Sequence, residues 1–242
     1  MGKRKIEVCF SPALYPYFEN KEAIVVVTDI LRASSAICTA FMNGVERIIP
    51  VSTIDEAKEW KTKGYKVAAE RDGIVKDFAD FGNSPFNFTR ERVISQHIVY
   101  STTNGTQAVH LASSGYQVLI GAFLNLSVLC DYAVACSRDI LILCAGWKNK
   151  FNLEDTLFAG AMTDKLLKTG KFETICDSAI ASQDLWKIAN ADILSYINKT
   201  AQRSRLKKNR LDDVIEYCLT QDLTRIIPVL KIDYLIKLKG FE

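Results

Sequence analysis

The stretch AIVVVTDILRASSA, residues 23–36, places a run of β-branched residues directly before the polar start of a helical pattern. An uninterrupted apolar run has no face suited to water, so it is typical of an interior strand in a parallel sheet. Asp29 ends this run, and Arg32 follows three residues later. Ser34 and Ser35 lie where the helical pattern begins. The stretch therefore predicts a buried strand with charged and hydroxyl groups at its carboxyl end.

The same alternation continues through most of the chain. Further apolar runs that predict strands lie at 5–10, 47–51, 65–70, 97–102, 116–122 and 139–145. Helical patterns lie near 33–43, 54–63, 104–114, 125–137 and 153–168. Strands that alternate with helices predict the α/β class, here α/β/α layers around a largely parallel or mixed sheet.

The expected domain organisation follows from the chain length and from the segments that could separate domains. The 242 residues suffice for one large domain or two small ones, and no repeat, low-complexity segment or linker divides them. We therefore expect a single domain over 1–242, with room for two lobes. Its C-terminal segment, 181–242, is expected to be mainly helical, while VLKIDYLIKL (229–238) fits either a last strand or a helix.

Composition excludes several classes of protein. With 48% hydrophobic and 24% charged residues, the chain is not disordered. Its apolar runs are far shorter than the roughly 20 residues of a membrane helix, and no signal peptide opens it. Seven cysteines without a CxxC pair favour a reducing compartment. We expect a cytoplasmic protein with no membrane partner, and a net charge of +3 is too small to indicate nucleic acid.

Ligands of open α/β sheets collect outside the carboxyl ends of the strands, so the loops after each run are the candidate site. Those loops are 29–35, 70–73, 101–106, 121–127 and 144–155. In the first, Arg32 suits a bidentate contact with phosphate or carboxylate, while hydroxyls and backbone N–H groups bind the other oxygens. A structural Asp29–Arg32 pair beside a serine cap explains the same residues equally well.

Acidic residues gather in the second loop region, 68–88, which contains Glu70, Asp72, Asp77 and Asp80. Mg²⁺ prefers oxygen ligands from one or two carboxylates, water and substrate phosphate. Charged loops are commonly only solvated, so this region alone does not establish a metal site.

The loop CAGWKNKFNLED (144–155) combines a thiol, two lysines and two acids. Glu154 and Asp155 also fit a helix-capping arrangement, which explains both carboxylates without catalysis. A buried core thiol is favoured for Cys144, because Lys150 stands where a cysteine-phosphatase loop needs arginine.

Common nucleotide and metal motifs are missing from the sequence. It has no GxxxxGK[ST] or GxGxxG, and its only histidines are His97 and His110. Asp29 also lacks the second aspartate, two residues later, of haloacid-dehalogenase phosphatases.

Five blocks together resemble the 2-phosphosulfolactate phosphatase family in order and spacing: DILRASS (29–35), ERDG (70–73), DFGNSP (80–85), TTNGT (102–106) and CAG with FNLEDTLFAGA (144–161). The resemblance implies an α/β fold distinct from the common phosphatases. It further implies a Mg²⁺-dependent hydrolysis of 2-phospho-3-sulfolactate to 3-sulfolactate, a step toward coenzyme M.

The resemblance implies one site for the candidate residues. Catalytic candidates are Asp29, Arg32, Cys144 and Glu154. Metal-ligand candidates are Asp29, Glu70, Asp80 and Asp155. Substrate-binding candidates are Arg32, Ser34, Ser35, Arg71, Asn83, Ser84, Thr103, Asn104, Gly105, Thr106, Lys148 and Lys150. Either water attacks directly, or Asp29 or Cys144 first takes the phosphoryl group.

The chain departs from the usual pattern of the family at several positions. ERDG replaces ERGG, and CAGWKNKFNLED replaces a sequence similar to CAGTKGRFSLED. Trp147 in place of a small polar residue, and Lys150 in place of arginine, alter the pocket size and the bidentate contact. Phosphatase chemistry tolerates such changes more readily than substrate identity does.

Two other functions remain compatible with the residues. One is a phosphatase of a different small phosphometabolite. The other is a non-enzymatic anion or nucleic-acid binding protein, suggested by six basic residues between Lys199 and Arg210. No aromatic residue interleaves there to stack bases, so a solvated helix face is favoured. The expected partner is a small anionic phosphorylated substrate, not nucleic acid, and a homo-oligomer is compatible with the sequence.

Overall fold

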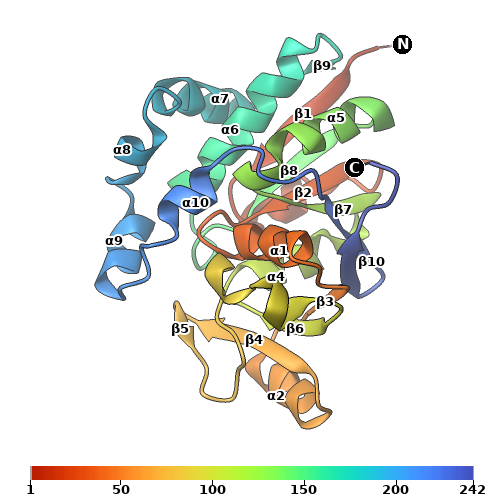
Figure 1. Ribbon diagram of the computed structural model, residues 1–242. Helices are drawn as coiled ribbons and strands as arrows, with labels where there is room; N and C mark the ends of the chain where they lie inside the picture. The colour runs from red at the N-terminus through yellow and green to blue at the C-terminus, as the bar shows by residue number, and fades with distance from the viewer. Residues whose placement is uncertain (1, 242) are drawn as a thin grey trace.

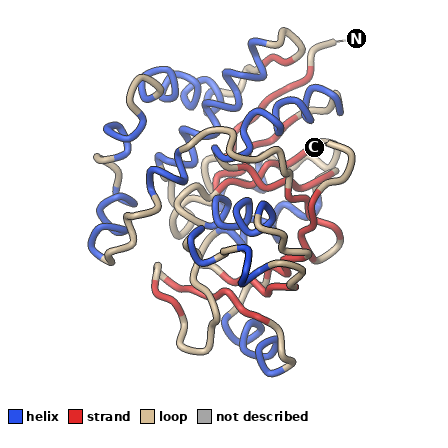
Figure 2. The backbone as a smooth tube through the Cα atoms, viewed as in Figure 1, coloured by secondary structure: helices blue, strands red, loops and turns tan. Residues whose placement is uncertain are grey.

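The computed structural model describes residues 2–241. Within them, one mixed sheet of 11 strands has the order β5-β4-β6-β3-β11-β10-β7-β2-β8-β1-β9. Figure 1 shows helices arranged around this sheet, and Figure 2 shows helix and strand alternating along the tube. The predicted layered α/β class with a mixed sheet is confirmed.

Every predicted strand and helix forms, with small shifts at the ends. The strands are β1 (Arg4–Cys9), β2 (Ile24–Thr28), β3 (Arg47–Pro50), β4 (Lys66–Arg71), β5 (Ile74–Val75), β6 (His97–Ser101), β7 (Gln117–Gly121), β8 (Ile140–Cys144), β9 (Phe172–Glu173), β10 (Pro228–Lys231) and β11 (Tyr234–Lys237). The α-helices are α1 (Ala33–Met42), α2 (Ile54–Thr62), α3 (Arg90–Val93), α4 (Gly105–Leu111), α5 (Leu126–Cys136), α6 (Leu153–Lys168), α7 (Asp177–Ala189), α8 (Ile193–Ile197), α9 (Ala201–Lys208) and α10 (Ile215–Leu219). Short 3-10 helices are η1 (Pro12–Tyr17), η2 (Pro85–Asn87), η3 (Ala112–Ser114) and η4 (Phe123–Asn125).

A C-terminal hairpin joins two parallel blocks of the sheet. One block is β4-β6-β3 and the other is β7-β2-β8-β1-β9. Between them, β11 pairs with β3 and β10 pairs with β7, both antiparallel. The segment expected to be mainly helical is helical as far as Leu219, and residues 228–237 then supply two central strands.

The sheet departs strongly from a flat arrangement. Strands β2 and β4 are six places apart in the order, which corresponds to roughly 30 Å in a flat sheet. The β3–β11, β11–β10 and β10–β7 pairings are all antiparallel, so the two blocks also run in opposite directions. Nevertheless, Asp29 after β2 and Glu70 at the end of β4 line the same pocket. The sheet is therefore not flat, and the twist accumulated between successive strands allows the ends of β2 and β4 to reach one pocket.

The core covers both faces of the central strands. All five residues of β2 are buried, and α1, α4 and α6 contact this strand. A smaller cluster, separate from the main core, lies beneath α2 and contains Val51, Ala57 and Val67. Across residues 2–241, no helix combines the length and hydropathy needed to cross a membrane.

Candidate active site

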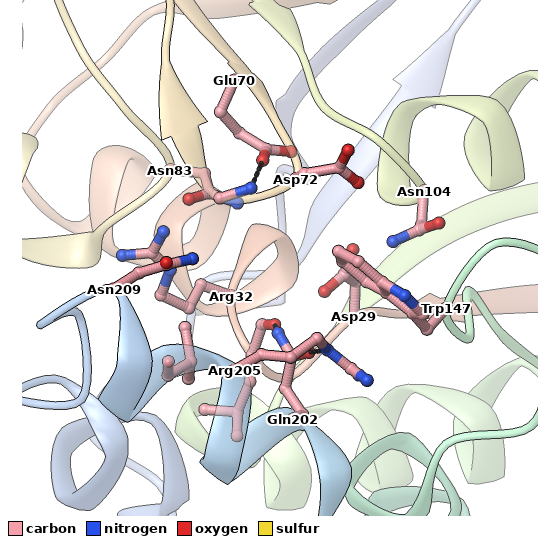
Figure 3. A pocket seen from close by; sticks show the side chains of 13 residues that line it. Asp29, Arg32, Glu70, Asp72, Asn83, Asn104, Trp147, Gln202, Arg205 and Asn209 are labelled. Atoms are coloured by element: carbon pink, nitrogen blue, oxygen red, sulfur yellow. Dashed lines mark hydrogen bonds between the residues drawn. The ribbon is translucent and has the colours of Figure 1, made fainter.

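A pocket lies where the loops after β2, β4, β6 and β8, four strands of the two blocks, meet α9 (Figure 3). The lining residues are Asp29, Leu31, Arg32, Glu70, Asp72, Gly73, Asn83, Asn104, Trp147, Gln202, Arg205, Leu206 and Asn209. The structure thus brings together five of the sequence-predicted site residues, namely Asp29, Arg32, Glu70, Asn83 and Asn104. The loop at 121–127 does not line this pocket.

Asp29 is held where β2 passes into α1. Its N–H donates to Ser34 Oγ at 2.7 Å, and the N–H of Ser34 donates to the Asp29 carbonyl at 2.8 Å. Gly105 begins α4 beside it, where an added Cβ would lie 3.0 Å from Asp29 Oδ2 and 2.9 Å from Ala33 Cβ. Glycine at this position therefore allows the backbone of α4 to approach the Asp29 carboxylate.

Buried acids surround Asp29. Burial raises its pKa well above the usual range, and the nearby carboxylates of Asp155 and Glu70 raise it further. Burial also raises the pKa of Glu154 to about 7. For Asp155, burial together with the neighbouring Glu154 raises the pKa to about 8. The site thus concentrates carboxylates in a place where their negative charges are poorly solvated.

Arg32 is a buried cation without a partner. Its side chain is 3% exposed, and within residues 2–241 it forms neither a hydrogen bond nor an ion pair. Burial lowers its pKa. Because a guanidinium carries five N–H donors, this side chain is suited to receive an anion in the pocket. The alternative of a structural Asp29–Arg32 ion pair is not realised.

Polar side chains of the neighbouring loops hold the pocket walls together. Glu70 Oε1 accepts from the N–H of Thr103 at 2.8 Å, and its Oε2 accepts from the N–H of Gly73 at 2.6 Å. Asn104 Oδ1 accepts from the N–H of Lys148 at 2.9 Å. The polar stretch between β6 and α4 therefore connects three loops.

Asp155 joins two further loops. Its Oδ1 accepts from the N–H of Ile30 at 2.8 Å, and its Oδ2 accepts from the N–H of Gly146 at 3.1 Å. Both oxygens are thus engaged by backbone, and Asp155 does not line the pocket. This carboxylate positions the loops after β2 and β8.

Comparison with known proteins agrees with this arrangement. A family model described as 2-phosphosulpholactate phosphatase matches residues 9–233. The chain belongs to the 2-phosphosulfolactate phosphatase family.

The alignments with curated relatives cover most of this chain. A probable 2-phosphosulfolactate phosphatase of Caldanaerobacter subterraneus subsp. tengcongensis is 36% identical over 215 residues, covering 87% of this chain and 89% of that protein. Proteins with the same name from Clostridium novyi and Thermotoga maritima are 34% and 36% identical, covering 93% and 85% of this chain and 96% and 88% of their own lengths. The enzymes that these names describe are phosphoric monoester hydrolases.

Asp80 and Arg71, both predicted for the site of this family member, lie outside the pocket. Asp80 accepts from Lys61 Nζ at 2.7 Å and from the N–H of Val67 at 2.8 Å, near the start of β4 and far from its carboxyl end. Arg71 donates to the carbonyl of Ser52 and to Ser101 Oγ, both at 3.0 Å. Neither residue lines the pocket. Successive strand residues point to opposite faces, which explains why Arg71 leaves the site that its neighbour Glu70 enters.

Cys144 is also placed differently from a catalytic residue. It is fully buried on the interior strand β8, and burial raises the pKa of its thiol well above the usual value. A thiol without access to the pocket is not available as a nucleophile. Cys144 thus occupies a core position outside the pocket lining, which favours the interpretation of a buried core thiol.

The remaining predicted residues lie in the loops that form the pocket walls or in the region around the pocket. Ser35 Oγ donates to the Ile30 carbonyl at 2.9 Å, and Thr106 Oγ1 donates to the Thr102 carbonyl at 3.2 Å. Ser84 occupies the N-cap position of η2, without a side-chain capping hydrogen bond, and does not line the pocket. At the exposed rim, Lys148 forms an ion pair with Asp72 at 2.8 Å. Lys150 and Glu154 border a neighbouring hollow that shares Trp147, Gln202 and Arg205 with the pocket.

Four pocket residues from α9 and its end were missed by the sequence analysis. Gln202, Arg205, Leu206 and Asn209 all line the pocket, and their spacing of i, i+3, i+4 and i+7 defines one helix face. That spacing was present in the basic run, which we interpreted as a solvated helix face. The pocket-facing side of this helix could not be recognised from charge, because the exposed residues Lys207 and Lys208 are as basic as Arg205.

No group of three or more histidine, cysteine or acidic side chains within residues 2–241 is arranged to hold a metal ion. The pocket nevertheless offers a further oxygen. Asn83 is 8% exposed, lines the pocket, and its Oδ1 accepts no hydrogen bond. A buried carbonyl oxygen without a donor is an uncommon feature that a ligand would satisfy.

Proposed function

We propose that this chain is a phosphatase that hydrolyses 2-phospho-3-sulfolactate, or a closely related phosphorylated hydroxy acid, with the help of Mg²⁺. The observation that carries this proposal is the unpartnered, buried Arg32 guanidinium in the pocket beside Asp29. A buried charge is costly unless something pairs with it, and phosphate matches the geometry of guanidinium in a bidentate contact. Family membership supports the same chemistry.

The composition of the pocket lining supports the magnesium part of this proposal. The pocket lining contains three acids, Asp29, Glu70 and Asp72, against two arginines. A polyanionic substrate entering an acidic pocket needs an additional cation. Glu70 and Asp155 already accept hydrogen bonds at both carboxylate oxygens.

Asp29 and Asn83 Oδ1 are therefore the protein oxygens that would hold this ion, with water and substrate phosphate completing its ligands. When bound, Mg²⁺ would neutralise charge on the phosphoryl group.

The chain's own residues would then bind and orient the substrate. Arg32 binds phosphoryl oxygens, and the Asn104 side chain and the Gly73 backbone form the adjacent wall. Burial of Cys144 argues against a phosphocysteine, which leaves water or Asp29 as the attacking group. The product would be 3-sulfolactate, formed in the cytoplasm in a route toward coenzyme M.

Phosphate release tests the proposal. Purified protein is incubated with 2-phospho-3-sulfolactate and a panel of phosphorylated hydroxy acids, before and after exhaustive treatment with EDTA. We expect release that chelation abolishes and added Mg²⁺ restores. Full activity in protein shown by metal analysis to be metal-free would contradict the magnesium requirement. Absence of release from every phosphorylated acid would contradict the phosphatase function.

A different small phosphometabolite is the second candidate substrate. The observation that favours it is Trp147, a large side chain in the pocket lining, which narrows the space around the carbon skeleton. The same panel separates the two, because the preferred substrate has the highest kcat/KM.

A further inference from the structure

The side chain of Arg205 on α9 is fixed in position by two contacts, one of them to a residue that is itself anchored. Its guanidinium carbon lies 4.4 Å from the centre of the Trp147 ring, and its Nε donates to Gln202 Oε1 at 2.7 Å. Gln202 is itself buried and donates through Nε2 to the carbonyl of Leu31 at 2.8 Å. Leu31 directly precedes Arg32, so the side chain of Arg205 is connected to the loop that carries the other arginine of the pocket.

The terminal N–H groups of Arg205 have no partner. Arginine has five N–H donors, and the hydrogen bond to Gln202 uses only the one on Nε. Within the described residues, 2–241, the side chain of Arg205 forms no other hydrogen bond and no ion pair. The nearby Glu154 acts on it only through space. The planar end of this guanidinium is therefore held by the protein and free to bind an anion at the pocket.

The two arginines differ in depth and in surroundings. Arg32 is almost completely buried beside Asp29, where the phosphoryl group and a metal ion are proposed to bind. Arg205 is half-buried and comes from α9, the pale blue helix of Figure 3, whereas Arg32 comes from the loop after β2. A substrate with a second anionic group therefore finds two arginines from different elements in the same pocket.

We infer that Arg205 binds a second anionic group of the substrate, a sulfonate or a carboxylate, and so makes the site selective for phosphorylated acids over simple phosphate monoesters. The inference rests on the proposed phosphatase function. Trp147 and Gln202 are positioning residues in this arrangement, because they hold the guanidinium plane without needing to contact the substrate. Arginine stacked on an aromatic ring keeps its donor edge available for such an anion.

The test compares three substrates that lose one anion at a time. They are 2-phospho-3-sulfolactate, 2-phospholactate, which lacks the sulfonate, and isopropyl phosphate, which lacks both acids. For Arg205→Met we expect kcat/KM for 2-phospho-3-sulfolactate to fall about 10- to 100-fold, at least about 10-fold more than for isopropyl phosphate. Equal losses on the first two substrates assign the contact to the carboxylate, and a loss confined to the first assigns it to the sulfonate.

Lys208→Met is the matched control, since Lys208 lies on the same helix, is exposed and does not line the pocket. Arg205→Lys keeps the charge without the planar edge, so we expect an intermediate loss. Far-UV circular dichroism establishes that each variant is folded. The inference is overturned if Arg205→Met and Arg205→Lys lower all three kcat/KM values by the same factor, or if they lower none.

A binding measurement separates this inference from the proposed function. If the wild-type chain releases phosphate from none of the three esters, the phosphatase proposal fails, and calorimetric titration with 3-sulfolactate still tests Arg205. Binding by the wild type that weakens about 10-fold or more in Arg205→Met supports the inference. Equal affinities, or no binding by the wild type, overturn it.

Discussion

Replacing Arg32 with methionine is expected to lower activity and raise stability at the same time. The guanidinium is 3% exposed and has no hydrogen bond or ion pair within residues 2–241. Burial lowers its pKa even though Glu70 attracts the charge. The folded protein is thus a less favourable environment for this cation than water is. A methionine of similar length removes the charge and retains much of the apolar contact.

The size of both effects follows from that environment. Apolar replacement of a whole buried ion pair is often neutral or stabilising by about 1–4 kcal/mol. Here only the unpaired cation is removed, and Asp29 and Glu70 lose a nearby positive charge. We therefore expect a gain near the lower end, about 1–2 kcal/mol, or roughly 2–8 °C in Tm for a chain of this size. Arg32→Lys keeps the charge but loses the bidentate contact with phosphate, which should lower kcat/KM on the order of 10²-fold.

Urea unfolding followed by circular dichroism, without phosphate and with EDTA, measures the stability. Phosphate release measures kcat/KM. Arg71→Met is the matched control, because Arg71 donates to the Glu70 and Ser52 carbonyls and to Ser101 Oγ. Its loss should destabilise the protein by about 1–3 kcal/mol. An Arg32→Met variant that is less stable than wild type while hydrolysing substrate normally would refute the reasoning.

Three further substitutions test the placement of individual residues. Gly105→Ala should displace the Asp29 carboxylate, because the added Cβ would lie 3.0 Å from its Oδ2. We expect kcat to fall about 10-fold. An unchanged kcat would show that the close approach of Gly105 to Asp29 is unimportant for catalysis. Cys144→Ser should reduce activity without abolishing it, and mass spectrometry after rapid acid quench should find no phosphocysteine; a phosphate on Cys144 would make the thiol the nucleophile. Asp80→Asn should leave kcat unchanged and lower the free energy of unfolding by about 1 kcal/mol at pH 7. Burial raises the pKa of Asp80, but the hydrogen bonds from Lys61 and Val67 outweigh it and the pKa is lowered. The deficit of Asp80→Asn should therefore disappear as the pH falls below 3.8, and a loss of metal-dependent activity instead would return Asp80 to the site.

The strands and helices, and the two central residues of the pocket, could be predicted from local sequence. Interior parallel strands require uninterrupted apolar runs, so residues such as those of β2 and β8 are recognisable without knowledge of their neighbours. Because ligands collect at the carboxyl ends of such strands, the same reasoning identified Asp29 and Arg32. These are properties of short segments, and they do not depend on which strands pair.

Long-range packing determined the rest of the site. Glu70 and Arg71 are adjacent and both charged, yet only Glu70 enters the pocket, because strand direction and sheet curvature assign them to opposite faces. The central position of the β10–β11 hairpin likewise depends on pairing with strands far away in the chain.

Arg205 shows the physical reason most clearly. A basic amphipathic helix satisfies the same local pattern whether its arginine faces water or a pocket, since either environment solvates the charge. The choice is made by contacts between residues distant in sequence, here Gln202 with the Leu31 carbonyl and Arg205 with the Trp147 ring. Such contacts form only when the chain has folded, so they cannot be predicted from the sequence pattern of α9.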